Sequence, residues 1–484
     1  MKSAKSFRAI EIFIIMASLA VSFIVIIVVG FDENPAQGYR LLWLLPLSFC
    51  LAIGLSIGVI RNIMSNLGVA ILVVGYFIRY VITPFLLALG NYRIVFIHLV
   101  TGDHIENAIY LMLYEILVVF LFMGLYSQAV SNRIARETID SANNSGDKGV
   151  HFLLLLCVIF CICLLVIVPE VLNSFTWIFS SSDQIAKIRY EIFDVVPRGT
   201  IKRVAVSLFI FGFNIIRYFI PVYLLRVFNK KHSWIRYWAS FVICFLPFLA
   251  INESNVQPFI GLIINVVMMT ELYPGRKKHI LTVVSLAGLT LLSLVLVAKI
   301  LLLASWQKTS GIASVALAFN AYFPGVGNVA AMENVPEVPK WNMLLGDLFA
   351  TIPFRNSLFP SYAQNSITLT QMYNLANGTR GSIVPCISGS KYYLGNALAP
   401  VVPAFVSCLA IKVSRKAKQE TSYWMIFYYV LLTVRIALIP TCYNHISIVH
   451  IMINQIIPTY AIIRLGYRLK TLDTYGMKSS QVIG

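Results

Sequence analysis

The chain has 484 residues, of which 58% are hydrophobic and only 12% are charged, and its mean hydropathy is +0.80. Soluble domains carry about 25% charged residues, so this composition excludes a soluble globular protein and predicts an all-α polytopic membrane protein. The net charge of +18 partly reports membrane topology, and no nucleic-acid partner is inferred from it.

The chain begins with Lys2, Lys5 and Arg8, which are followed by an apolar run that extends to Gly30. This order is similar to that of a secretory signal peptide. However, the run is longer than the apolar region of a signal peptide, and no small-residue cleavage site follows it. We therefore expect an uncleaved first membrane span.

Apolar stretches long enough to cross a bilayer, about 17–25 residues each, occur about twelve times along the chain. They fall at 9–30, 41–60, 67–89, 108–126, 151–168, 204–226, 237–251, 256–273, 279–301, 393–411, 422–440 and 446–463. This pattern predicts transmembrane helices 1–9 in residues 1–301, a large loop at 302–392, and transmembrane helices 10–12 with a tail in 393–484.

Basic residues give the expected orientation, because cytoplasmic loops carry an excess of lysine and arginine. The short loops at 229–232 and 275–279 are strongly basic, whereas the short loop at 251–255 is not. These loops obey the rule when the amino terminus is inside. Both termini and the tail are then cytoplasmic, and the loop 302–392 is extracytoplasmic.

The loop 302–392 is rich in proline and glycine but also in aromatic residues. Disordered segments have few aromatic residues, so we expect this loop to be folded. Within it, apolar residues recur at helical spacing and end near Pro353: Trp341, Leu344, Leu345, Leu348 and Ile352. The pattern predicts an amphipathic helix that lies at the outer interface of the membrane.

Charged residues inside predicted spans are costly and are candidates for function. Arg79 and Glu115 lie at similar depth in the third and fourth spans. A buried structural ion pair is the simpler interpretation, and a catalytic role is the alternative. Arg217 has no evident carboxylate partner. Its guanidinium should face a water-filled cavity or bind an anion such as a phosphate, unless its role is structural.

Lys299 and Arg435 lie near the outer ends of their predicted spans. Long basic side chains at such positions can extend to the interface, which is the simpler interpretation. The alternative is an outward-facing basic cavity that they form together with Arg355, Arg380 and Lys391.

Several signatures of soluble enzymes are missing. The chain has no phosphate-binding glycine loop, no dinucleotide fingerprint and no evident Ser/His/Asp arrangement. Its eight cysteines lack the spacing of a metal site or a disulfide framework, so no metal or cofactor is expected. The loop 302–392 contains no histidine. Two outer carboxylates, Glu253 and Asp347, are candidates for a general base, whereas Glu333 and Glu337 are interpreted as solvated loop residues.

The run 381–400 resembles the stretch that closes the large outer loop of bacterial O-antigen and oligosaccharide repeat unit polymerases (Wzy type). The residues that carry the resemblance are Gly381, Pro385, Tyr392, Tyr393, Gly395 and Pro400. The layout of about twelve spans with one large outer loop extends it over the chain, as in the GT-C-like architecture of these polymerases and related ligases. Many relatives carry Ser-Arg-Gly at the outer end of a middle span. Here residues 252–255 read Asn-Glu-Ser-Asn, without the arginine.

The resemblance implies a metal-independent glycosyltransferase in the bacterial cytoplasmic membrane. Such an enzyme moves a growing glycan from undecaprenyl pyrophosphate to the next lipid-linked repeat unit on the outer face. Its partners would be the bilayer, a flippase and a chain-length regulator. The resemblance also implies that outer basic residues bind pyrophosphate, here Arg217, Arg355, Arg380, Lys391 and Arg435. Glu253 or Asp347 would accept the proton of the acceptor hydroxyl.

Two alternatives stay open. An O-antigen ligase has a similar layout but uses a histidine in the large loop, and 302–392 has none. A lipid-linked oligosaccharide flippase or another transporter would explain Arg217, but it gives no reason for the length of this loop.

Overall fold

The computed structural model describes residues 2–32, 35–56, 59, 62–63, 65–92, 100–129, 147–175, 201–229, 234–249, 256–307, 311–352, 367–379 and 382–480. All the regular secondary structure in these ranges is helical. This confirms the all-α prediction for the described part of the chain.

The first half of the chain forms long helices, several of which are interrupted by short 3-10 or π turns. They are α1 (Lys2–Gly30), α2 (Leu44–Leu55), α4 (Leu67–Phe77), the π turn η2 (Ile78–Ile82), α5 (Thr83–Leu89), α6 (Gly102–Ala129), α7 (Asp147–Ile167), α9 (Ile201–Asn229), α10 (Trp234–Phe245), α11 (Val256–Leu272) and α12 (Lys277–Gln307). Short 3-10 turns lie at Tyr39–Leu41, Pro169–Ser174, Leu246–Phe248 and Pro274–Arg276.

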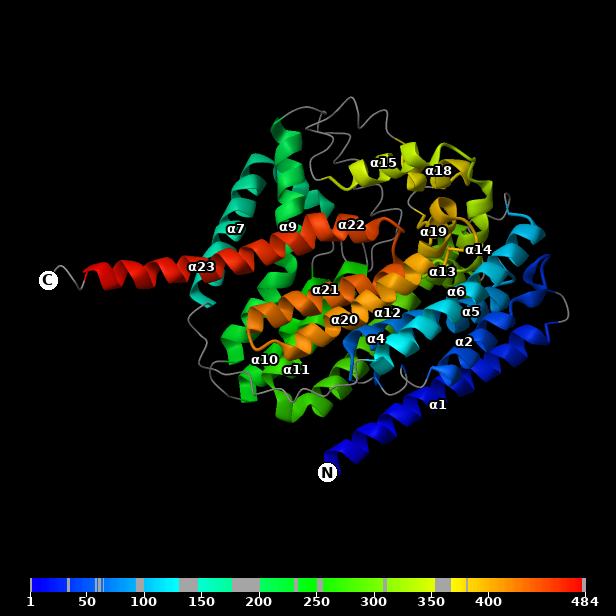
Figure 1. Ribbon diagram of the computed structural model, residues 1–484, viewed down its shortest axis with the longest axis horizontal. Coiled ribbons are helices and arrows are strands. Elements are labelled where there is room, and N and C mark those ends of the chain that lie inside the picture. The colour runs from blue at the N-terminus through cyan, green and yellow to red at the C-terminus, as the bar shows by residue number, and fades with distance from the viewer. Residues whose placement is uncertain are drawn as a thin grey trace.

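The second half alternates short helices with a final group of long ones. They are α13 (Gly311–Tyr322), α14 (Val326–Ala330), the 3-10 turn η6 (Ala331–Asn334), α15 (Lys340–Ala350), α18 (Leu369–Ala376), α19 (Cys386–Leu394), α20 (Val401–Gln419), α21 (Tyr423–Cys442), α22 (Ser447–Ile451), the π turn η7 (Met452–Ile456) and α23 (Ile457–Ser480). Figure 1 shows α13, α14, α15, α18 and α19 gathered at one end of the bundle of long helices.

Every predicted span overlaps a helix. By length and composition, six of the described helices can cross a membrane, or seven if the bent pair Gln257–Leu272 and Pro274–Gly288 is one span. The prediction was wrong about the start of the span 393–411. There α19 ends at Leu394, Gly395 adopts a left-handed φ of 83°, and the next helix begins only at Val401.

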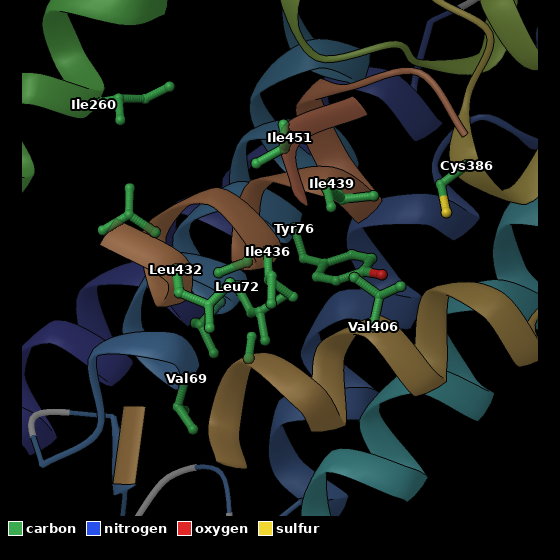
Figure 2. Packing of buried hydrophobic residues seen from close by; sticks show 14 of the residues in the cluster. Val69, Leu72, Tyr76, Ile260, Cys386, Val406, Leu432, Ile436, Ile439 and Ile451 are labelled. Carbon is green, nitrogen blue, oxygen red and sulfur yellow. The ribbon is translucent and has the colours of Figure 1, made fainter. Parts of the chain in front are cut away.

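The core of the bundle lies around α21. About 83% of the most apolar stretch of α21 is buried inside the protein, compared with 22% of the corresponding stretch of α7, which lies at the periphery. Helices α4 and α20 pack against α21 and against each other, and Figure 2 shows Leu72 and Tyr76 of α4 beside Ile436 and Val406. Gly68 permits this packing, because a Cβ there would lie 2.7 Å from the carbonyl oxygen of Ala410.

A buried ion pair joins η2 to α6, as predicted. Arg79 Nη1 donates to Glu115 Oε1 at 2.9 Å, and both side chains are fully buried. Arg79 Nε also donates to the carbonyl oxygen of Pro324 at 2.8 Å, and the Tyr80 hydroxyl donates to Glu115 Oε2 at 3.0 Å. The pair therefore ties the turn before α14 to the helix bundle.

Helix α15 confirms the helix predicted around Trp341. Its buried side is made by Met343, Gly346 and Asp347. The apolar residues of the predicted pattern lie mainly on the opposite, exposed side: Trp341 (77% exposed), Leu345, Leu348 and Ile352. A helix with polar contacts inward and an apolar face outward has the form expected of an interfacial helix.

Candidate functional site

The structure describes some of the predicted site residues but not others. Glu253, Arg355, Arg380 and Gly381 lie outside the described residues. Asp347 lies on α15, and the remaining members of the predicted set are distributed over α9, α19 and α21.

Asp347 is held in a buried contact between four segments. It is 1% exposed, and its Oδ1 accepts a hydrogen bond from the backbone N–H of Leu369 at 3.0 Å. Its Oδ2 accepts one from the Tyr393 hydroxyl at 2.6 Å and lies 2.8 Å from His445 Nε2. The carboxylate thus joins α15 to the start of α18, to α19 and to the turn before α22.

His445 is not among the site residues predicted from the sequence. It lies outside 302–392, follows α21 and reaches Asp347 across 98 positions of the chain. It is 9% exposed, and its Nδ1 has no hydrogen-bond partner among the described residues. Its only sequence signal is the Tyr-Asn-His interruption between two apolar runs at 443–445, which marks a turn at the same end of the bundle.

The imidazole of His445 rests directly on the backbone of α19. A Cβ at Gly389 would lie 2.4 Å from both Cβ and Cγ of His445 and 2.9 Å from its Cδ2. A glycine is therefore required for the ring to approach this closely. The Tyr393 ring lies on another side, with its centroid 5.9 Å from that of the imidazole.

Burial, and then the hydrogen bond to Asp347, raise the pKa of Tyr393 above its usual value. The phenol therefore keeps its proton at neutral pH and acts as a donor to Asp347. The other residues of the 381–400 motif shape the helix that carries Tyr393. Pro385 is the residue immediately before α19, and Gly395 follows its last residue. Tyr392 donates to the carbonyl oxygen of Val338 at 3.4 Å.

Arg435 forms a second buried polar cluster inside the bundle. Its side chain is 3% exposed, so the simpler prediction that it extends to the interface is wrong. Its guanidinium donates to Gln455 and Gln257 Oε1, at 2.7 Å each, and to the hydroxyls of Tyr443 at 2.7 Å and Tyr218 at 2.9 Å. Four elements therefore meet at one positive charge.

The partners of Arg435 are all neutral. Two are amides, and burial raises the pKa of Tyr443 to about 12, so that phenol carries no charge at physiological pH. Among the described residues no carboxylate pairs with Arg435. This contrasts with Arg79, whose charge is balanced by Glu115.

Arg217 lies near the same cluster. Its guanidinium carbon is 5.3 Å from the centre of the Tyr218 ring, and that of Arg435 is 5.2 Å from the same centre. Two predicted anion-binding residues, on α9 and α21, are thus brought to one tyrosine. Lys391, a third, instead forms an ion pair with Glu333 of η6, so part of its charge is balanced within the protein.

The two clusters are connected by a short piece of chain. Tyr443 contacts Arg435, and His445, two residues later, contacts Asp347. Among the described residues no group of three or more His, Cys, Asp or Glu side chains is placed to hold a metal ion.

No protein-family model matches the chain, and no match is found among curated proteins or solved structures. Its function is therefore inferred from the two polar clusters and from the sequence.

Proposed function

We propose that this chain polymerises lipid-pyrophosphate-linked oligosaccharide repeat units at the outer face of a bacterial cytoplasmic membrane. The proposal includes about twelve spans, cytoplasmic termini and an extracytoplasmic segment 302–392 that folds over the bundle. The donor is a glycan on undecaprenyl pyrophosphate, the acceptor is the next lipid-linked unit, and the product is a surface polysaccharide. A flippase that supplies the units and a chain-length regulator are the proposed protein partners.

The observation that carries the proposal is the buried charge of Arg435. Burying a guanidinium without an anion costs several kcal/mol, and hydrogen bonds to neutral groups offset only part of that cost. Neutral acceptors such as Gln257 and Gln455 are also released more easily than a carboxylate. Entry of a pyrophosphate would replace weak partners with a charged one that guanidinium groups bind well.

This arrangement suits transfer from a pyrophosphate. Negative charge accumulates on the leaving pyrophosphate as its bond to the sugar breaks, and fixed positive groups in a region of low dielectric stabilise that charge. Arg435 and Arg217, which both lie near the Tyr218 ring, are the described candidates for this role. Arg355, Arg380 and Lys391 remain proposed ligands of the same pyrophosphate groups.

A second candidate is a ligase that transfers finished glycan to another lipid acceptor. The absence of histidine from 302–392 counted against it in the sequence. The contact between Asp347 of this segment and His445 weakens that objection, because a histidine does reach the folded segment from outside it.

The glycan ladder of a deletion strain, resolved by gel electrophoresis, tests the proposal. Surface glycan that stops at a single repeat unit is the expected result, because units are exported but not joined. Full-length glycan trapped on its lipid carrier would support the ligase. Repeat units that accumulate on the cytoplasmic side would support a flippase, and an unchanged ladder would overturn the proposal.

A further inference from the structure

We infer that His445 is the general base of the transfer reaction and that Asp347 is a positioning residue for it. The inference rests on the proposed function and identifies the group that accepts the proton. It also revises the expectation that Asp347 itself takes the proton from the acceptor.

The hydrogen bonds of Asp347 fix the proton positions of His445. The N–H of Leu369 and the hydroxyl of Tyr393 both donate to this carboxylate, and carboxylate oxygens act as acceptors. His445 Nε2 lies 2.8 Å from Asp347 Oδ2, the oxygen that also accepts from the Tyr393 hydroxyl. Nε2 therefore carries a proton and donates it to this oxygen. In a neutral imidazole the lone pair then lies on Nδ1.

Nδ1 is the nitrogen of this ring that makes no contact of its own. It is buried and has no hydrogen-bond partner in the part of the chain that the structure describes, although buried polar atoms are nearly always hydrogen-bonded. The ring is held in place by Gly389, by Tyr393 and by Asp347, so the free nitrogen is positioned rather than mobile. A fixed imidazole with one bonded and one free nitrogen is the arrangement required of a general base.

Other carboxylates near the site are less suited to this task. Both oxygens of Asp347 are already engaged, Oδ1 by the N–H of Leu369 and Oδ2 by Tyr393 and His445. Glu333 is paired with Lys391, and Glu337 lies exposed between two prolines. His445 is the described group that combines a free acceptor atom with a fixed geometry.

The reaction step is then as follows. The acceptor sugar hydroxyl gives its proton to His445 Nδ1 while its oxygen forms a bond to the anomeric carbon of the donor glycan. The bond between that carbon and the pyrophosphate oxygen breaks, and its electron pair leaves with the lipid pyrophosphate. The positive imidazolium is stabilised by the Asp347 carboxylate and later releases its proton to water, so the base is regenerated.

The test uses the full chain in lipid nanodiscs with a synthetic lipid-pyrophosphate-linked repeat unit, and it compares initial rates. His445→Ala and His445→Gln are expected to lower kcat by about 10²–10⁴-fold with little change in KM. Imidazole added to the buffer should restore part of the rate of His445→Ala, because it can occupy the vacated space. It should not accelerate the wild type.

Asp347→Asn tests the positioning role. The amide oxygen can still accept from Leu369, but the NH₂ group would donate to Nε2 and force the proton onto Nδ1. We expect a loss of kcat of about 10⁴-fold, as such a tautomer change produces in a related dyad, with KM retained and no rescue by imidazole.

Two matched controls lie close by. His450→Ala removes an exposed histidine of α22, and Glu337→Gln removes an exposed carboxylate of the same segment as Asp347; both should keep the wild-type rate. Suppose that the wild type is active. If His445→Gln is then equally active, or if imidazole does not restore His445→Ala, the inference is overturned but the proposed function is not. Inactive wild type would instead contradict the proposed function.

Discussion

Asp347 and His445 meet at 2.8 Å although 98 positions separate them in the chain. The contact brings a helix of the segment 302–392 onto the turn between the two last long helices. Any movement of α15 therefore changes the surroundings of His445, and the folded segment and the bundle form one site rather than two.

Replacing Gly389 by alanine should disable this site without removing any polar side chain. The new Cβ would lie 2.4 Å from two atoms of His445, so the imidazole must move away from Asp347. We expect the rate of glycan transfer to fall by about 10²-fold, as when a general base is lost. Gly54→Ala is the control, because no atom of the described residues lies within 4 Å of a Cβ there. Equal rates for the two variants would contradict the close packing of His445.

Arg435→Gln should impair activity much more than stability. The contact with a pyrophosphate would contribute about 1.5–3 kcal/mol, so kcat/KM should fall by about 10- to 100-fold. Stability should change less, because removing a buried charge that no carboxylate balances offsets part of the cost of losing its hydrogen bonds to four neutral groups. Arg435→Lys keeps the charge but not the planar guanidinium, so its kcat/KM should lie between those of the wild type and Arg435→Gln. If Arg435→Gln is unstable but transfers glycan at the wild-type rate once a bound ligand stabilises it, then Arg435 has only a structural role.

Arg79→Met should show the opposite pattern. It leaves the Glu115 carboxylate buried and alone, which typically costs about 3–5 kcal/mol, and unfolding in detergent can measure this loss. The double variant Arg79→Met/Glu115→Leu should recover most of the stability, because apolar replacement of both partners is often neutral. If the single variant unfolds like the wild type, the pair does not stabilise the fold.

The exposed apolar face of α15 predicts contact with lipid. In vesicles of lipids brominated near the headgroup, Trp341 should be quenched, so the quenched share of tryptophan fluorescence should drop in Trp341→Phe. Trp424→Phe is the control, because Trp424 is fully buried in the bundle and its loss should not lower the quenched share. Identical quenching of wild type and Trp341→Phe would mean that α15 faces water.

Tyr393 predicts a loss of stability at alkaline pH. Its pKa is raised in the folded protein, first by burial and then by Asp347, whereas an unfolded tyrosine ionises near pH 10. The folded state then holds the proton more tightly than the unfolded chain, so the free energy of unfolding decreases as pH rises above about 10. The Tm of Tyr393→Phe in detergent should decline less than that of the wild type over this range. Parallel declines would contradict the prediction.

The sequence predicted features that depend on local pattern. Apolar runs located the helices, the spacing around Trp341 located α15, and similar depth in neighbouring spans identified the pair of Arg79 and Glu115. The start of α20 was predicted too early. The run 395–400 contains no charged residue, so its composition does not indicate the left-handed Gly395 and the turn that follows it.

Features that depend on contacts distant in sequence were not predicted. Nothing near His445 in the sequence indicates Asp347, since the pairing is produced by the fold of 302–392 over the bundle. Similarly, the position of Arg435 near the end of an apolar run does not show that Tyr218 and Gln257 approach it from α9 and α11. Both facts arise from packing between helices, which the pattern within one helix does not record.

The most direct measurement is the reaction of the purified chain, in a bilayer, with a defined lipid-pyrophosphate-linked repeat unit as the only glycan. The account predicts products of two or more units, with one free lipid pyrophosphate released for each linkage formed. Repeat units that remain unjoined on their carrier, or that cross the bilayer intact without release of lipid pyrophosphate, would contradict it.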